Sequence, residues 1–167
     1  MAETLIFDKG APRAVVYQQL LPQLRALVEA EDDPIANAAN LMAALREALG
    51  FFWVGVYYVR GEELVLGPFQ GPVACTRIRR GRGVCGAAWA RGQTVVVPDV
   101  DAFPGHIACA SASKSEIVVP VLGADGHVVA VLDVDSDHLA DFSAALDQAP
   151  LEEVARLLAR HGTPPRN

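Results

Sequence analysis

The spacing of apolar residues predicts two amphipathic helices at the start of the chain. Residues 13–29 carry apolar side chains at roughly helical intervals, although Pro22 within them is expected to bend or break the helix. The second helix is better defined, because Asp33 can cap it, Pro34 suits its first position and Gly50 can close it. Its apolar stripe comprises Ile35, Ala38, Leu41, Met42, Leu45 and Leu49. Stripes of this kind pack on a core, so both helices are assigned to the scaffold.

Alternating and β-branched residues predict strands after these helices. Residues 52–60 form the first strand, and a short turn leads into residues 64–66 to give a hairpin. The period of two places Trp53 and Tyr57 on one face, with Gly55 between them. Two interpretations of that face stay open. The aromatic side chains are core, or they wall a small-ligand pocket in which Gly55 leaves space.

The later elements complete a mixed pattern of strands and helices. We expect a loop at 67–72, a short strand at 75–78, a helix at 84–90 that Gly92 ends, a strand at 94–97, a long loop at 99–108, a hairpin of strands 117–122 and 128–134, and a final helical region that Ser143 caps and whose regular part begins at Pro150. This order lacks a regular alternation of parallel strands and helices. It predicts an α+β fold, with a central antiparallel sheet and helices packed on its faces. We expect one domain over residues 1–167, with frayed tails at 1–12 and 162–167.

Composition and charge exclude several kinds of partner. The chain is 51% hydrophobic and 20% charged, which is ordinary for a soluble globular protein. Its net charge of −6 argues against nucleic acid and anionic membranes, because both need a basic surface. No apolar run approaches the roughly 20 residues of a membrane span, and the N-terminus lacks a secretory pattern. We therefore expect a cytoplasmic protein, whose thiols stay reduced unless a disulfide is transient and catalytic.

A basic, glycine-rich stretch precedes the helix at 84–90. The glycines between residues 81 and 86 lack the spacing of a phosphate-binding loop, so we expect them to permit a tight turn into that helix. The nearby arginines form either a solvated face or an anion site. They are Arg77, Arg79, Arg80, Arg82 and Arg91.

The stretch from Phe103 to Pro120 carries the candidate chemistry. It opens with a turn-forming Pro-Gly, presents Cys109 among small residues, and places Glu116 where the loop becomes a strand. Asp133 and Asp135 lie on another apolar strand and point the same way, at spacing i, i+2. Charge on such a strand is costly unless a cation or a shared proton meets it.

The three cysteines favour thiol chemistry over metal binding. No Cys-x-x-Cys pair occurs, so a zinc site is not expected. Cys75 and Cys109 lie at loop–strand junctions, where sulfur atoms from separate segments could approach each other. Cys85, at a helix start, better fits a buried cysteine that acts as a small hydrophobic residue.

Taken together, these motifs resemble those of the free methionine-(R)-sulfoxide reductases, a catalytic branch of the GAF-domain fold. The matching segments lie between Asp8 and Leu158 and are Cys75-Thr-Arg-Ile, Gly81-Arg-Gly-Val-Cys-Gly86, Pro98-Asp99, Phe103-Pro-Gly-His-Ile-Ala-Cys109, Ser113 to Pro120, and Leu132-Asp-Val-Asp-Ser136. The resemblance implies a homodimeric GAF domain that reduces the free amino acid without a bound cofactor. It also implies thioredoxin as electron donor, supplied by NADPH through thioredoxin reductase.

Carried over by position, the resemblance implies a role for each candidate residue. Cys109 matches the nucleophile, Cys75 the cysteine that resolves it, and Cys85 an auxiliary third cysteine. The carboxylates of the substrate site are matched by Glu116, Asp133 and Asp135, and the aromatic wall by Trp53 and Tyr57.

Two residues depart from the pattern of the family. Ala110 stands where the family often has Asp, and Lys114 where it often has Asn. Ala110 makes the loop less acidic, and Lys114 could favour the Cys109 thiolate if its side chain points inward.

The expected reaction needs a thiol, a second thiol and an acid. A thiolate attacks the sulfoxide sulfur and becomes a sulfenic acid, which the second thiol condenses to a disulfide. Crowding of carboxylates raises at least one pKa, so that one group keeps its proton near neutrality and acts as the acid. Two rival classes remain. One is a non-catalytic GAF sensor of a nucleotide or small metabolite, and the other is a thiol redox sensor whose output is oxidation of Cys75 and Cys109.

Overall fold

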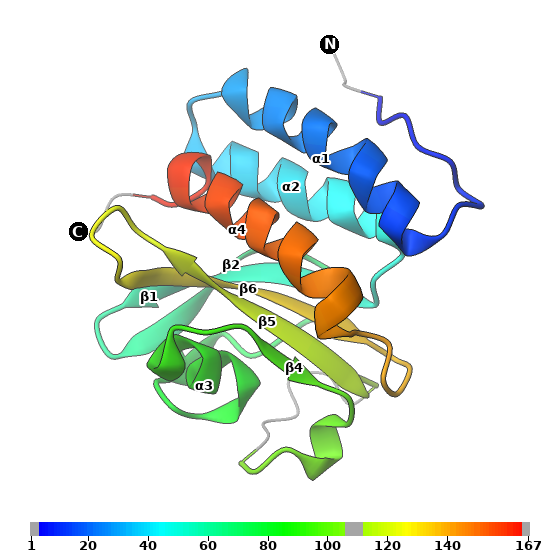
Figure 1. Ribbon diagram of the computed structural model, residues 1–167. Coiled ribbons are helices and arrows are strands. Elements are labelled where there is room, and N and C mark those ends of the chain that lie inside the picture. Colours follow the sequence, from blue (N-terminus) through cyan, green and yellow to red (C-terminus); the bar gives the residue numbers. More distant parts are fainter. Residues whose placement is uncertain (1–3, 106–111, 165–167) are drawn as a thin grey trace.

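An antiparallel sheet separates three of the helices from the fourth (Figure 1). The computed structural model describes residues 4–105 and 112–164, and within these ranges the sheet has six strands in the order β3-β2-β1-β6-β5-β4. The strands are β1 (Trp53–Arg60), β2 (Glu63–Gln70), β3 (Arg77–Arg79), β4 (Val95–Val97), β5 (Ser115–Leu122) and β6 (Val128–Ser136). Every neighbouring pair is antiparallel. The predicted α+β class is confirmed.

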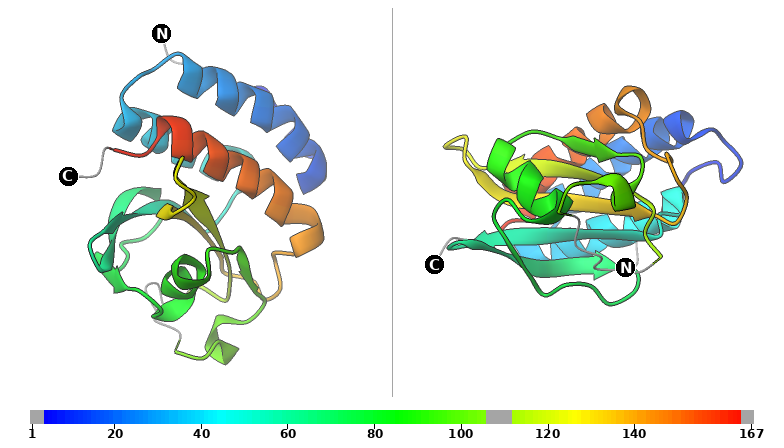
Figure 2. Two further views of the ribbon diagram at one scale, coloured as in Figure 1. Left: turned by 60° about the vertical axis from the view of Figure 1, so that its left-hand side comes forward. Right: turned by 90° about the horizontal axis from the view of Figure 1, so that it is seen from below.

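The helices form a thick layer on one face and a single cover on the other (Figure 2). On the first face α2 (Pro34–Leu49) and α4 (Ala149–His161) contact the sheet, and α1 (Arg13–Glu29) packs across both. On the second face α3 (Gly83–Arg91) lies against β5 and β6. No helix in the described ranges is long and apolar enough to cross a membrane.

The limits of the predicted helices are largely confirmed. Asp33 caps α2 by accepting hydrogen bonds from the backbone N–H groups of Ile35 and Ala36, at 2.9 and 2.8 Å. Ser143 caps a π-helical turn at Ala144–Gln148, which continues into α4. The left-handed φ angles of Gly81 (77°) and Gly83 (60°) produce the tight turn expected before α3.

Two details of the helix predictions are corrected: a break at Pro22 and a buried Ile35. α1 runs through Pro22 without a break, because Leu20 and Leu24 on either side are fully buried and their packing outweighs one missing hydrogen bond. Ile35, expected in the apolar stripe of α2, is 46% exposed in the first turn. The buried apolar stripe therefore begins one turn later, at Ala38.

β2 is longer than the sequence suggests. The loop predicted at 67–72 is partly wrong, because Gly67 to Gln70 continue the strand, and Phe69 and Gln70 pair with Gly55 and Val54 of β1. Proline normally ends a strand, but Pro68 lies where the register shifts between Gly55 and Tyr57. A bulge of this kind leaves part of the ladder unpaired and so tolerates proline.

The side chains of β1 point alternately to the two faces of the sheet and so belong to two separate apolar clusters. Val54, Val56 and Tyr58 pack into the core under α1, α2 and α4. Trp53 and Tyr57 face the opposite way and pack with residues of α3. The predicted period of two is confirmed, and the second face is where the candidate site residues gather.

The first described residues form neither helix nor strand but follow α1. The backbone N–H groups of Ile6 and Asp8 donate to the side-chain oxygens of Gln23 and Gln19, both at 2.9 Å. Fraying of the two tails stays a prediction.

Candidate active site

The register of the central strands gathers the predicted carboxylates on one face. Asp133 and Asp135 alternate along β6, and Asp135 lies directly opposite Glu116 of β5. Residues opposite each other in an antiparallel pair direct their side chains to the same face. The face that carries Trp53 and Tyr57 therefore also carries all three acids, because β1 pairs Trp53 with Asp135.

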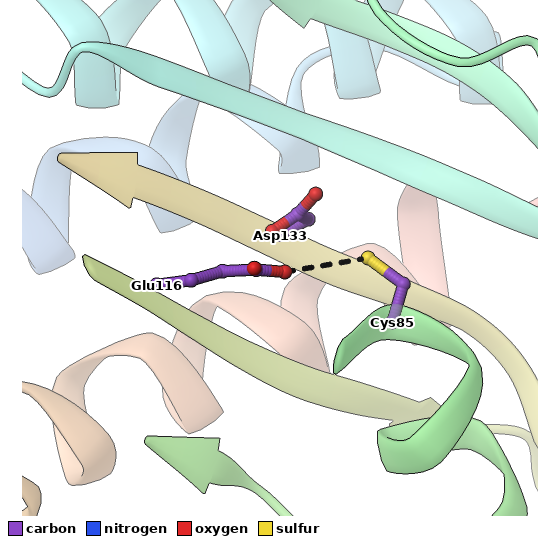
Figure 3. A group of neighbouring side chains, drawn as sticks. All are labelled: Cys85, Glu116 and Asp133. Atoms are coloured by element: carbon purple, nitrogen blue, oxygen red, sulfur yellow. Dashed lines mark hydrogen bonds between the residues drawn. The ribbon is translucent and has the colours of Figure 1, made fainter. Parts of the chain in front are cut away.

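Cys85 joins this group from α3, on the other side of the space. Its Sγ atom lies 3.9 Å from Oε1 of Glu116, within hydrogen-bond range for sulfur. One ligand atom each of Cys85, Glu116 and Asp133 lies within 4.8 Å of the others, and Figure 3 shows the three side chains turned toward a common space. We refer to these three residues as the acid–thiol cluster.

The acid–thiol cluster is almost sealed from solvent. Cys85 is 4% exposed, and Glu116 and Asp133 are each 6% exposed. Oδ1 of Asp133 is buried and has no hydrogen-bond partner among residues 4–105 and 112–164. An orphaned buried carboxylate oxygen is costly, so the site is built to meet a proton or a cation.

Burial raises the pKa of every member of the cluster. For Glu116 the desolvation is reinforced by the negative charges of Asp133 and Asp135, and for Asp133 by that of Asp135. The Cys85 thiol has its pKa raised by burial and then by the charges of Asp133 and Glu116. The raised pKa values favour the protonated forms of the Glu116 and Asp133 carboxyl groups and of the Cys85 thiol.

Asp135 differs from its neighbours because it has a polar partner. Burial raises its pKa to about 6, while a hydrogen bond from the Ser113 hydroxyl opposes the shift. Asp135 is consequently the most readily ionised of the three acids and can hold a cationic group.

Trp53 and Tyr57 form a stacked aromatic wall beside the acids. Their ring centroids are 6.0 Å apart, and Trp53 also stacks on Phe69 at 5.4 Å. The hypothesis that Gly55 leaves space for a ligand is wrong. A Cβ atom at Gly55 would lie 2.2 Å from the Trp53 ring, so the indole itself fills that space.

The same aromatic residues anchor the segment that carries Cys75. The Tyr57 hydroxyl donates to the backbone oxygen of Cys75 at 3.0 Å, and Nε1 of Trp53 donates to that of Pro72 at 3.0 Å. Burial, followed by the charge of Asp133, raises the pKa of Tyr57 well above its usual value, so the hydroxyl stays a donor. The backbone of Cys75 is therefore fixed next to the aromatic wall.

Three further positions from the sequence analysis are Cys109, Ala110 and Lys114, and of these the structure describes only Lys114. Cys109 and Ala110 lie outside the described ranges. Lys114 is exposed, so its side chain does not point inward as the thiolate hypothesis requires.

The sequence does not predict two contacts of the site. Cys85 is expected as a buried or auxiliary cysteine but not as a partner of Glu116, and the hydrogen bond of Ser113 to Asp135 is not expected. The only available indication was that Glu116 and Asp133 need a partner on an apolar sheet, and nothing in the sequence says that α3 supplies it.

The basic stretch is solvent-facing. Arg77 pairs with Glu63 at 3.0 Å, and the Arg80 guanidinium lies over the Trp89 ring at 5.5 Å. All of the arginines named above are exposed, as expected for a solvated face.

Comparison with known proteins defines the class. Residues 33–161 match the family model of the GAF domain, and the chain belongs to that family. It is 44% identical over 142 residues to a free methionine-R-sulfoxide reductase of Escherichia coli, covering 84% of this chain and 86% of the relative. It is 54% identical to a free methionine-R-sulfoxide reductase of Neisseria meningitidis solved in complex with its substrate, with a TM-score of 0.91 and 95% of each chain covered. A GAF domain-containing protein A of Dictyostelium discoideum is 55% identical over 159 residues, covering 95% of this chain and 99% of the relative. Within the GAF domains, the chain is a member of the free methionine-R-sulfoxide reductase family.

Proposed function

We propose that this protein reduces free L-methionine-(R)-sulfoxide to L-methionine. The observation that carries the proposal is the pair of buried carboxyl groups, Glu116 and Asp133, on the same face as the Trp53–Tyr57 wall, where burial raises their pKa values. Such an arrangement suits a small zwitterion with an S-methyl group. A methionine sulfur against an aromatic ring gains roughly 0.3–1.5 kcal/mol. Relatives that carry the name of this activity support the proposal.

The reaction is balanced by two thiols of this chain. The Cys109 thiolate attacks the sulfoxide sulfur and forms an S–S bond, while the sulfoxide oxygen takes up protons and leaves as water. Water then attacks the Cys109 sulfur, which breaks the S–S bond, releases methionine and leaves Cys109 as a sulfenic acid. The Cys75 thiol then displaces the hydroxyl group of the sulfenic acid, which releases water and forms a disulfide. The dithiol of thioredoxin reduces that disulfide, and NADPH restores thioredoxin through its reductase.

The three acids have two roles, proton donation and binding of the substrate ammonium group. Glu116 or Asp133 donates a proton to the departing oxygen, because burial raises their pKa values and so favours the protonated carboxyl form. Asp135, with its lower pKa of about 6, is ionised and holds the substrate ammonium. Cys85 donates its hydrogen bond to Glu116 and positions that acid, so it acts through another residue.

A coupled assay tests the activity. The protein is incubated with racemic free methionine sulfoxide, thioredoxin, thioredoxin reductase and NADPH. We expect NADPH oxidation to stop when half of the racemate is consumed, because one epimer is reduced. N-acetyl-methionine sulfoxide is the matched control, and it should not react because it lacks the ammonium that Asp135 holds.

The rival classes predict other results. A non-catalytic small-ligand sensor would oxidise no NADPH with any sulfoxide. A thiol redox sensor would show one disulfide formed by peroxide and no turnover of methionine sulfoxide.

From the resemblance to the reductase family we also propose that the protein is a homodimer and lies in the cytoplasm. Analytical sedimentation would test the dimer, and cell fractionation would test the location.

A further inference from the structure

We propose that the acid–thiol cluster of Cys85, Glu116 and Asp133 is a binding site for a thiophilic divalent cation, with Zn²⁺ as the best match. The inference goes beyond the reductase activity, since that reaction uses no metal. It rests on the distances, the burial and one unpartnered oxygen atom within the cluster.

The distances suit a tetrahedral ion. Zinc binds sulfur at about 2.3 Å and carboxylate oxygen at about 2.0–2.2 Å, which at a tetrahedral angle sets sulfur and oxygen about 3.5 Å apart. The observed separation of Cys85 Sγ and Glu116 Oε1 is 3.9 Å, and all three donor atoms lie within 4.8 Å of one another. Small rotations of these side chains therefore close the site around an ion, as Figure 3 suggests from their convergence.

An independent observation points to a missing cation. Oδ1 of Asp133 lacks any hydrogen-bond partner in the described part of the chain, and Asp133 is 94% buried, with 6% exposed. No ion pair among residues 4–105 and 112–164 involves Glu116 or Asp133. A divalent ion would satisfy the orphaned oxygen and offset both carboxylates at once.

The donor set selects among metals. Magnesium and calcium prefer six or more oxygen ligands, whereas one thiolate with two carboxylates suits zinc or cobalt. Binding must displace protons from the Cys85 thiol and from the carboxyl groups of Glu116 and Asp133, so it becomes weaker as the pH falls. Three protein ligands also leave a fourth coordination position open, as in zinc sites that exchange a water molecule.

If the proposed function is correct, a metal ion bound to the acid–thiol cluster would affect substrate binding. The ion would fix the two acids that donate protons and would place positive charge where the substrate ammonium approaches. Zinc and methionine sulfoxide would then exclude each other.

The test uses the untagged Cys75→Ser/Cys109→Ser protein, which retains Cys85 as its single thiol. We expect isothermal titration to show one Zn²⁺ bound per chain and no binding of Mg²⁺. Co²⁺ should give a thiolate-to-cobalt charge-transfer band. Adding Cys85→Ser should abolish that band and weaken Zn²⁺ binding at least about tenfold.

Further variants keep the test decisive if Cys85→Ser fails to fold. Glu116→Gln and Asp133→Asn, each in the same double variant, should weaken Zn²⁺ binding, while the exposed Glu62→Gln should not. Absence of Zn²⁺ binding, or binding that Cys85→Ser leaves undiminished, overturns the metal site. Since the double variant cannot turn over, this result is independent of the reductase assay. Equal affinity for methionine sulfoxide with and without Zn²⁺ would overturn the mutual exclusion.

Discussion

At the scale of single residues, a buried carboxyl group with a raised pKa is the centre of the proposed chemistry. The pKa of Glu116 is raised by burial and by the charges of Asp133 and Asp135, so the protonated form is favoured and the proton is lost as the pH rises through that pKa. Asp133 behaves in the same way. The site can therefore protonate a leaving oxygen in a place that excludes bulk water.

Replacing Glu116 tests that proton donation. Glu116→Gln cannot act as an acid, so we expect kcat/KM for methionine sulfoxide to fall by about 10²- to 10⁴-fold. In the native protein the rate of the first turnover should decline at alkaline pH once the acid ionises, and in the variant this decline should be absent. Rapid-quench measurement of methionine across a pH series provides both readouts. Glu62→Gln, at an exposed position, is the control, and an unchanged kcat/KM in Glu116→Gln would remove Glu116 from the mechanism.

Replacing Cys75 tests the second thiol. Cys75→Ser should form about one methionine per active site and then stop, because the sulfenic acid has no partner. Cys109→Ser should form none. Mass spectrometry after dimedone treatment should find the trapped sulfenic acid only in Cys75→Ser. Multiple turnovers at the native rate in Cys75→Ser would contradict the resolving role.

The sequence predicts which site residues share a strand face, but it does not predict which residues meet through tertiary packing. Asp133 and Asp135 share a face because strands repeat every two residues, and that much is local. The approach of Cys85 to Glu116 depends on how α3 packs over β5, which is a tertiary contact. A buried cysteine looks the same in a sequence whether its neighbours are apolar or acidic.

At the scale of the elements, β1 serves the scaffold and the site with alternate residues. Its pairing with β6 sets Gly55 opposite Asp133, and the absent side chain lets the Trp53 ring lie over the strand. The caps at Asp33 and Gly50 were predictable because capping is local. The sequence wrongly predicts a break at Pro22 and a loop at Pro68, because the packing of α1 and the bulge in β2 depend on distant residues.

A methyl group at Gly55 should disrupt the aromatic wall. Gly55→Ala would place Cβ 2.2 Å from the Trp53 ring and 2.7 Å from Phe69 Cβ, so the indole must move. We expect a destabilisation of about 1–3 kcal/mol, a shift in tryptophan fluorescence and a raised KM for the sulfoxide. Gly10→Ala is the matched control, since its Cβ would meet only Asp8 Oδ1 at 3.7 Å. Equal melting temperatures for the two variants would show that the wall tolerates the methyl group.

At the scale of the whole molecule, a partly buried ionic group of Arg13, Asp141 and Asp147 ties the start of α1 to the segment before α4. Arg13 contacts Oδ1 of Asp141 at 2.7 Å and Oδ1 of Asp147 at 3.2 Å. Asp147 is fully buried and also accepts hydrogen bonds from the Tyr17 hydroxyl and the Ser143 N–H group. These contacts hold the helical layer together across more than a hundred residues of chain.

Replacing Arg13 should lower the free energy of unfolding far more than replacing a surface arginine. Arg13→Met leaves Asp147 buried without its cation, so we expect a loss of about 3 kcal/mol of unfolding free energy. Arg25→Met breaks the exposed pair with Glu153 and should cost about 0.2–1 kcal/mol. Urea denaturation of both variants provides the comparison. Similar midpoints would show that the Arg13 contacts contribute little.

Stability should fall as the pH rises, because of the acids in the site. The folded-state pKa values of Glu116, Asp133 and Asp135 are raised, so the folded protein holds more protons than the unfolded chain above the ordinary carboxyl range. For Asp135 the stability is lost as the pH rises through its folded-state pKa of about 6, and for the other two acids the loss continues to higher pH. Each group contributes up to about 1.4 kcal/mol per pH unit in its window. Glu116→Gln/Asp133→Asn should flatten the dependence of the urea midpoint on pH, and an identical slope would contradict the shifts.

The alternation of β1 between two cores also limits how this protein can change in length. Inserting or deleting one residue within β1 would send Val54 and Val56 toward the acids and bury Trp53 and Tyr57 among the helices. Hairpin tips escape this constraint, since the turn at Gly123 to His127 lies beyond the paired residues of β5 and β6. Length variation should therefore be confined to such tips, and tags or fused domains are best inserted there.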